Sequence, residues 1–403
     1  MSDTDATKLA IDGGEPVISP PIPLHRPWLG EEELAAVREV FASGWITTGP
    51  ATHRFESAIR EYTGAAWAVG TNSCTAALHL ALLLNHVGPG DEVIVPALTF
   101  PATANCIVHC GATPIFCDVD PTTWCLNPAD ARSCISERTK AVIPVHLAGV
   151  TADLDAIHDW ADVEGIAVIE DAAHALETKY RGRKVGAISP QTCLSFYATK
   201  NITTGEGGML LGTVPEQEAV ARHWGLHGIS SDAYTRHGSI HLSTYELEYP
   251  GYKYNMFDIV AAIGYVQFGK LDYYYQRRQR LMDIYKAKLG NRDDLVFQGC
   301  HSEDKSALHL AIIKLKPEMQ RVDRLQIAGA LLAEGVCLGV HYRPLHLLKY
   351  YRERKDQLGL SLPVAEELGQ TVLTLPLFPR MTDAEAGLVV TAVAKVLNYY
   401  HRD

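Results

Sequence analysis

The chain has 403 residues, of which 21% are charged and 47% hydrophobic, and this is the balance of a folded globular protein with room for one large and one smaller domain. Its formal net charge of -11 argues against a nucleic-acid groove or an anionic membrane as the main partner, because both select basic surfaces. Residues 1–10 carry acids where a signal peptide carries basic residues, and no uninterrupted apolar span is present, so we expect a cytoplasmic protein without a membrane segment.

Between residues 64 and 212, short β-branched runs alternate with helical stretches, which is typical of a largely parallel sheet with helices on both faces. Seven strands are expected, at residues 66–70, 92–96, 114–118, 141–146, 167–171, 193–197 and 209–212. Helices are expected between them, for example at residues 75–84, 102–110 and 152–164. This pattern predicts one seven-stranded α/β sheet.

The pattern changes after residue 212. A helix at 215–224 is followed by a polar segment, residues 225–249, which we interpret as a long functional loop, and then by a helical pattern over 258–289. The remainder predicts strands at 307–314, 336–342 and 371–375 with helices at 321–334 and 383–399. We therefore expect an N-terminal tail (1–25), a large domain (26–275) and a smaller C-terminal α/β domain (276–403).

A lysine and a carboxylate carry the first chemical signal. Lys200 precedes a glycine cluster, and Asp171 ends an apolar strand after Glu170. A lysine amine can hold an aldehyde as a Schiff base, and a carboxylate beneath a pyridine nitrogen keeps that nitrogen protonated, so the pair indicates a pyridoxal phosphate site. Taken alone, each feature is better explained as a surface lysine before a turn or as an acidic strand end.

Three further segments fit the same cofactor. In Gly70-Thr-Asn-Ser-Cys-Thr-Ala-Ala-Leu, a strand ends and a helix begins, and such a helix start with its hydroxyls favours a phosphate. Phe100 could stack on a flat ring, or could be a core residue. His174 follows Asp171 by one short turn and should lie near the ring, and Ser195 offers another hydroxyl to the phosphate.

The nine cysteines include no Cys-x-x-Cys pair. The pairs Cys106 with Cys110 and His223 with His227 could each supply two metal ligands, but neither has a convincing second pair. We therefore expect buried reduced thiols and no metal site.

Four ordered motifs resemble the DegT/DnrJ/StrS family of nucleotide-sugar aminotransferases over roughly residues 20 to 400. They are Gly70-Thr-Asn-Ser-Cys-Thr-Ala-Ala-Leu, Glu170-Asp-Ala-Ala-His-Ala, Ser195-Phe-x-x-x-Lys-Asn-Ile-Thr-x-Gly-Glu-Gly-Gly and Pro250-Gly-Tyr-Lys-Tyr-Asn-Met-x-Asp. The resemblance implies a fold-type I pyridoxal phosphate enzyme of the aspartate aminotransferase superfamily, working as a homodimer with shared active sites.

The resemblance also assigns roles to individual residues. Lys200 matches the Schiff-base lysine, Asp171 the pyridine-nitrogen partner and Phe100 the stacking aromatic residue. Ser73, Cys74 and Ser195 match phosphate-binding positions, and Asn255 matches an asparagine that reaches the phosphate of the neighbouring subunit. His341 and Arg343 match a segment near the active-site mouth, where Arg343 could face a diphosphate or make a surface salt bridge, and Tyr252 lies in a segment expected to bind substrate.

The implied reaction moves an amino group from L-glutamate to a keto nucleotide-sugar, with 2-oxoglutarate as product and pyridoxamine phosphate as the intermediate form of the cofactor. Family members that act on carbon 4 often carry histidine at the position of His174, whereas many that act on carbon 3 carry glutamine, which favours a 4-keto hexose. Three alternatives remain open: a 3-keto sugar aminotransferase, a sugar dehydratase using the same cofactor, and a non-catalytic regulator that binds it.

Overall fold

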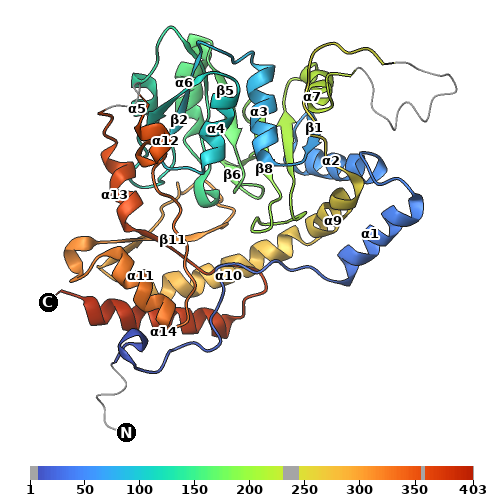
Figure 1. Cartoon of the computed structure of the whole chain (residues 1–403). Coiled ribbons are helices and arrows are strands. Elements are labelled where there is room, and N and C mark those ends of the chain that lie inside the picture. Colours follow the sequence, from blue (N-terminus) through green and yellow to red (C-terminus); the bar gives the residue numbers. More distant parts are fainter. Residues whose placement is uncertain (1–7, 230–244, 355–358, 403) are drawn as a thin grey trace.

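The computed structural model describes residues 8–229, 245–354 and 359–402 (Figure 1). Its main feature is a seven-stranded sheet in the order β1-β9-β8-β5-β4-β2-β3, which confirms the predicted sheet. Every pairing is parallel except those of β9, which runs antiparallel to both of its neighbours. The strands are β1 (Trp67–Thr71), β2 (Glu92–Pro96), β3 (Thr113–Cys117), β4 (Thr139–Val142), β5 (Ala167–Asp171), β8 (Gln191–Ser195) and β9 (Gly208–Gly212).

Helices cover both faces of this sheet, because side chains alternate between the faces along each strand. On β9, Leu210 packs in the cluster that contains α3, whereas Met209 and Leu211 pack in the cluster that contains α2 and α9. The helices of this part are α1 (Glu31–Ser43), α2 (Pro50–Thr63), α3 (Cys74–Leu84), α4 (Pro101–His109), α5 (Pro128–Ser133), α6 (Leu154–Glu164), α7 (Gln217–Gly225) and α9 (Asp258–Gly269).

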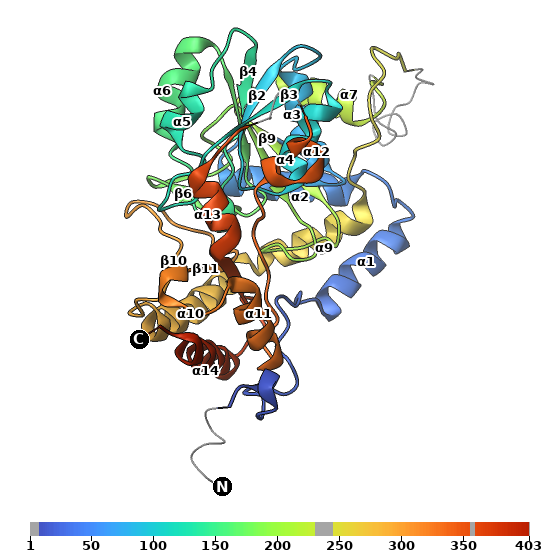
Figure 2. The ribbon, with the colours of Figure 1, turned by 60° about the vertical axis from the view of Figure 1, so that its left-hand side comes forward.

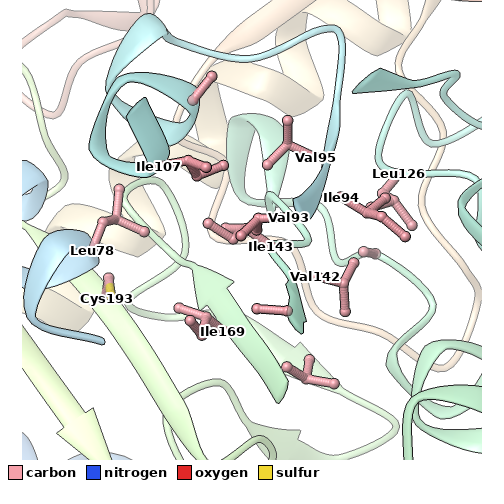
Figure 3. Packing of buried hydrophobic residues seen from close by; sticks show 14 of the residues in the cluster. Leu78, Val93, Ile94, Val95, Ile107, Leu126, Val142, Ile143, Ile169 and Cys193 are labelled. Carbon is pink, nitrogen blue, oxygen red and sulfur yellow. The ribbon is translucent and has the colours of Figure 1, made fainter. Parts of the chain in front are cut away.

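The largest hydrophobic cluster fixes the central strands against these helices. Figure 3 shows Leu78 of α3 and Ile107 of α4 pointing toward Val93, beside Ile143, while Ile94 is grouped elsewhere with Leu126 and Val142. Neighbouring residues of β2 thus serve two different packing layers, as expected for a strand buried on both faces. All nine cysteines are free, and four of them are fully buried in this cluster, as predicted. The prediction of buried thiols fails for the others, because four are half-buried and Cys300 is exposed.

A smaller antiparallel sheet, in the order β10-β11-β12, lies below the large one in Figure 1. It consists of β10 (Leu295–Phe297), β11 (Ala311–Leu315) and β12 (Val372–Leu375), packed with α11 (Arg324–Ala333) and α14 (Asp383–Tyr400). This part of the chain also contains two short helices, α12 (Lys349–Arg352) and α13 (Pro363–Thr371). A separate hairpin consists of β6 (Lys179–Tyr180) and β7 (Arg183–Lys184).

The prediction of a strand at residues 336–342 is wrong. This segment makes only single bridges, from Val336 to Ile22 and from Gly339 to Thr374, and the third strand of the small sheet is β10 instead. The segment leaves the sheet edge after Gly339, which carries His341 and Tyr342 toward the large sheet.

The strand predicted at 307–314 begins later, at Ala311, because the residues before it bond to the large domain. The amide of Ala307 donates to the carbonyl of Gly149 at 3.2 Å, and that of His309 donates to the carbonyl of Ala148 at 3.0 Å. This short segment therefore ties the small sheet to a turn beside the end of β4.

The helical pattern predicted over 258–289 is two helices, α9 and α10 (Leu271–Leu289), which meet at Lys270. The Lys270 amine binds the carboxylates of Glu32 and Glu33 at 2.6 and 2.7 Å, which fixes α1 beside the junction. The helix α10 runs from the large sheet to the small one (Figures 1 and 2). The proposed domain boundary at residue 275 falls inside this helix and stays a prediction.

Part of the expected N-terminal tail is packed. Leu9, Ile18 and Ile22 are buried in the hydrophobic cluster of the small sheet, and the Glu334 carboxylate accepts hydrogen bonds from the amides of Ala10 and Val17. Figure 2 shows the C-terminal end of the chain beside α14. In the described ranges, no helix is long and apolar enough to cross a membrane.

The antiparallel direction of β9 shapes one edge of the large sheet. The carboxyl ends of β1, β8 and β5 meet there, and the first residue of β9, Gly208, pairs with both Thr71 and Ser195. A side chain on Gly208 would lie 2.4 Å from the carbonyl carbon of Ser73 and 2.5 Å from the nitrogen of Cys74. Only glycine allows the first turn of α3 to approach β9 so closely.

We therefore predict opposite effects of two Gly→Ala substitutions on stability. Gly208→Ala should lower the free energy of unfolding by about 1–3 kcal/mol, because the methyl group meets rigid backbone. Gly387→Ala is the matched control, because it lies within α14 with open space around it and should stabilise the protein by up to about 1 kcal/mol. Urea denaturation of both variants measures the difference, and equal stability of the two would contradict the close approach.

Candidate active site

A cavity of about 520 Å³ opens at the edge of the sheet where these strand ends meet. It brings together eight of the residues expected to bind cofactor or substrate, from segments spread over the whole chain: Ser73, Cys74, Phe100, Asp171, His174, Ser195, Lys200 and His341. Thr75, Thr99, Tyr197, Glu206 and Tyr342 also line it.

The Asp171 side chain ends β5 at the floor of the cavity and is buried. Its carboxylate accepts a 2.8 Å hydrogen bond from the Thr103 hydroxyl and a 3.2 Å bond from the Ala173 amide. Burial nevertheless raises the pKa of Asp171, and these bonds and the nearby Lys200 amine only partly offset the effect. The carboxylate is therefore short of positive partners within the protein.

The neighbouring Glu170 faces the other side of the sheet and is buried among partners of its own. It binds the His146 ring nitrogen at 2.8 Å and the Ser189 amide at 3.0 Å. Burial alone would raise the pKa of Glu170, but these hydrogen bonds outweigh it and the pKa is lowered. Glu170 is satisfied inside the protein, so Asp171 is the carboxylate of this pair that can serve a bound cation.

The Lys200 side chain enters the same cavity from the segment after β8. Its amide donates to the carbonyl of Tyr197 at 2.9 Å, which holds the turn that carries the side chain. Burial lowers the pKa of Lys200 to about 8, while the nearby Cys74 and Asp171 oppose the shift. About a tenth of the amine is therefore unprotonated at pH 7, far more than for a lysine with its usual pKa, and the unprotonated form is the one that acts as nucleophile or base.

The start of α3 forms the end of the cavity opposite the floor of β5. Ser73 is the N-cap, and its hydroxyl accepts a 3.1 Å hydrogen bond from the Ala76 amide. The amides of the first turn and the helix dipole favour an anion at this position, and Ser195 lies beside it through the shared neighbour Gly208. Burial raises the pKa of the Cys74 thiol, so the thiol stays protonated beside an anion.

Aromatic rings and a histidine form the mouth and side of the cavity. Phe100 is exposed, and its ring lies 6.1 Å from that of Tyr342. His174 is buried, and its Nδ1 accepts a 3.2 Å hydrogen bond from the Ala148 amide, so its proton lies on Nε2, 3.5 Å from the Tyr342 hydroxyl. Burial lowers the pKa of His174 well below its usual value, and the ring is neutral.

Three expected residues lie elsewhere. Tyr252 stacks on Tyr254 at 5.0 Å, in an aromatic group away from this cavity. The Asn255 side chain donates to the Thr48 hydroxyl at 2.7 Å and does not line the cavity of its own chain. Arg343 lines a different cavity and donates to the carbonyl of Leu347 at 3.2 Å. Most of the expected loop at 225–249 lies outside the described residues.

Sequence reasoning missed two side chains that touch this site. Thr103 lies in the first turn of α4 and orients Asp171, and Tyr342 reaches the cavity beside His341. Both belong to segments with a recognisable signal, a helix start after a strand end and a run of aromatic and basic residues. Their side-chain directions depend on long-range packing, which local patterns do not encode.

The donor set of this cavity fits pyridoxal phosphate. The Lys200 amine can hold the aldehyde. The Asp171 carboxylate lacks a strong positive partner in the protein, so it can pair with the protonated nitrogen of a pyridine ring. Ser73 and the first turn of α3 would hold the phosphate, and the open face of Phe100 would cover the ring.

Comparison with known proteins identifies the family and its cofactor. The chain matches the DegT/DnrJ/EryC1/StrS aminotransferase family over residues 27–394. It is 40% identical to the spore coat polysaccharide biosynthesis protein SpsC of Bacillus subtilis over 377 residues, covering 93% of this chain and 97% of the relative.

Two solved structures share the fold and carry information on ligands. The sugar aminotransferase Spr1654 of Streptococcus pneumoniae, described as putative, was solved in pyridoxamine and pyridoxal phosphate forms; its pyridoxamine phosphate form matches with a TM-score of 0.87 at 33% identity, over 94% of this chain and 99% of that chain. DesI, solved with its TDP-sugar product, matches with a TM-score of 0.85 at 27% identity, over 96% and 97% of the two chains. The cofactor of this fold is pyridoxal phosphate, with pyridoxamine phosphate as its aminated form. The chain belongs to the DegT/DnrJ/EryC1/StrS aminotransferase family of sugar aminotransferases.

Proposed function

We propose that this protein transfers the amino group of L-glutamate to carbon 4 of a 4-keto hexose linked to a nucleoside diphosphate. The observation that carries the proposal is the meeting of Lys200, Asp171 and His174 around one cavity. When bound there, pyridoxal phosphate accepts the electrons of the bond that is broken at the substrate carbon. The other contributions come from the residues of the chain.

Lys200 would act as the base in both halves of the reaction. With a pKa of about 8, its amine can accept a proton from the donor carbon and later return one to the sugar carbon. Asp171 would keep the pyridine nitrogen protonated, and Thr103 would hold that carboxylate in place. His174 stays neutral, so its Nε2 hydrogen can be donated to an oxygen of the substrate.

Two observations support a nucleotide-linked sugar as the acceptor. DesI, which shares this fold, was solved with a TDP-sugar product. His174 lies in the cavity wall, at the position where the resemblance associates histidine with reaction at carbon 4. A primary amine at Lys200 also fits a transaminase better than the related dehydratases, which carry histidine at that position.

The predicted regiochemistry can be read directly from the product. The enzyme should convert to its pyridoxamine phosphate form with glutamate alone and should then aminate a 4-keto nucleotide sugar, but not its 3-keto counterpart. Absorbance follows the first step, and NMR locates the new amine. Amination only at carbon 3 would overturn the carbon-4 assignment, and failure to convert with glutamate would overturn glutamate as the donor.

We further propose a homodimer whose active sites are shared. Apolar side chains are exposed along α1 and beyond it, at Leu34, Phe41 and Ile46, which is unusual for a free surface. Asn255, which the resemblance assigns to the phosphate of the neighbouring subunit, does not line the cavity of its own chain. A second copy that covers α1 could receive Asn255 in its cavity.

Mixing two inactive variants tests the shared site. Lys200→Ala removes the amine and Asn255→Ala removes the amide, so each homodimer should lose at least about tenfold in rate. A mixed dimer contains one site with both residues, and activity should reappear after subunit exchange. Exchange is verified with two affinity tags, and a mixture that exchanges but stays inactive would contradict the shared site.

A further inference from the structure

A small recess of about 80 Å³ lies beside Lys200 and shares part of its wall with the cofactor cavity. Lys200 lines both spaces, so its side chain can reach either of them. The recess alone is lined also by His25 and His309, two histidines without a role in the proposed reaction. Much of its remaining wall is apolar and consists of Leu24, Leu310, Leu375 and Leu377.

The His309 ring is fixed by the residue that follows the lysine. The Asn201 side-chain nitrogen donates to the Glu177 carboxylate at 2.6 Å and to the carbonyl of Ala307 at 3.2 Å, so its oxygen is the atom that faces His309. This oxygen lies 2.8 Å from Nδ1 of His309 and can only accept, so Nδ1 carries the proton. Burial lowers the pKa of His309 well below its usual value, so the ring is neutral and its Nε2 is an acceptor.

The His25 ring is fixed by a residue just before the lysine. Its Nε2 is buried and has no hydrogen-bond partner among the described residues, and the ring donates from Nδ1 to the backbone carbonyl of Ala198. Burial lowers the pKa of His25 to about 4, so this ring is also neutral and its Nε2 is a second acceptor. A buried acceptor without a partner is costly, and it is expected where another state of the protein supplies the donor.

The other polar groups around the recess do not fill this need. His174 accepts at Nδ1 from a backbone amide, so it presents a hydrogen at Nε2 to the Tyr342 hydroxyl. His341 contacts the Thr374 hydroxyl through Nδ1 at 2.7 Å, and either atom can donate. No acidic side chain lines the recess, and its only cation is Lys200.

The Lys200 amine is the donor that can meet the two acceptors. Its positive charge acts on both rings, which are anchored to the residues on either side of it in the chain. In the pyridoxamine phosphate form of the enzyme, the amine is not bonded to the cofactor. Asp171, which acts on Lys200 from the cofactor cavity together with Cys74, is then engaged by the pyridine nitrogen. A buried ammonium group needs acceptors of its own in that state.

We propose that the recess receives the Lys200 amine when it is not bonded to the cofactor, and that Nε2 of His25 and Nε2 of His309 accept its hydrogen bonds. The proposal rests on the proposed aminotransferase function and adds two residues that contact its reacting amine. The recess is large enough for two or three water molecules at about 30 Å³ each, which suits an amine and excludes a nucleotide sugar.

Two substitutions of His309 separate its two hydrogen bonds. Asparagine carries its amide nitrogen as many bonds from Cβ as Nδ1, so His309→Asn keeps the donor to Asn201 and removes the acceptor in the recess. Glutamine carries its oxygen as far along as Nε2, so His309→Gln keeps the acceptor and loses the bond to Asn201. His25→Asn makes the first change at the other ring, and His109→Asn, on the exposed end of α4, is the matched control.

Lysine labelled with ¹³C at Cε reports the protonation of its amine by NMR, and the Lys200 signal is the one that Lys200→Arg removes. In protein loaded with pyridoxamine phosphate, the pKa of Lys200 should fall by about one pH unit or more in His309→Asn and in His25→Asn, because the ammonium form loses an acceptor. It should stay within about 0.3 pH units of the unaltered protein in His309→Gln and His109→Asn.

An unchanged pKa of Lys200 in both asparagine variants would overturn the recess assignment. A fall in His309→Gln as large as that in His309→Asn would overturn the role of His309, because it would trace the effect to the bond with Asn201. If borohydride reduction of the pyridoxal phosphate form still labels Lys200, either result leaves the aminotransferase function standing. If Lys200 is not labelled, the function itself fails.

Discussion

The buried carboxylate of Asp171 is the constraint on which the site depends. A carboxylate removed from water needs positive or hydrogen-bonding partners. Among the described residues, Asp171 accepts hydrogen bonds from the Thr103 hydroxyl and the Ala173 amide, while Lys200 and His146 act on it from further away. Its neighbour Glu170 is equally buried but fully partnered. The same strand thus carries one carboxylate that the fold satisfies and one that is left available to a bound cation, and alternation along β5 separates them.

The strand order of the sheet places this carboxylate beside the other groups that line the cavity. Parallel strands place the ends of β1, β5 and β8 at one edge, and the antiparallel β9 begins at that edge with Gly208. The anion-binding turn at Ser73 can then approach the segment of Lys200 closely. The fold thus gathers the first turn of α3, the Lys200 amine and the Asp171 carboxylate around one cavity, an arrangement that suits a flat cofactor carrying a phosphate.

Much of this was predictable from the sequence, because strand ends, helix starts and glycine turns are local signals. Ser73, Asp171, Ser195 and Lys200 each sit at such a signal, and the structure gathers all four. The seven strands could also be predicted from local signals, because a strand buried on both faces appears in the sequence as a continuous apolar run.

What could not be predicted depends on contacts between distant segments. The 336–342 segment has the composition of a strand, yet it leaves the sheet edge to deliver His341 and Tyr342 to the cavity. Arg343 follows Tyr342 directly in the sequence but lines a different cavity. Its position next to these residues in the sequence therefore did not predict its position in the structure. His25 and His309 lie far from any motif and meet only because the N-terminal segment and the start of β11 pack against the large sheet.

Borohydride reduction followed by peptide mass analysis tests the central claim most directly. If the lowered pKa and position of Lys200 make it the residue that binds the cofactor aldehyde, reduction should add the cofactor mass to the peptide containing Lys200 and to no other. Lys200→Ala should abolish the label while the protein stays folded. A label on any other lysine would contradict the account.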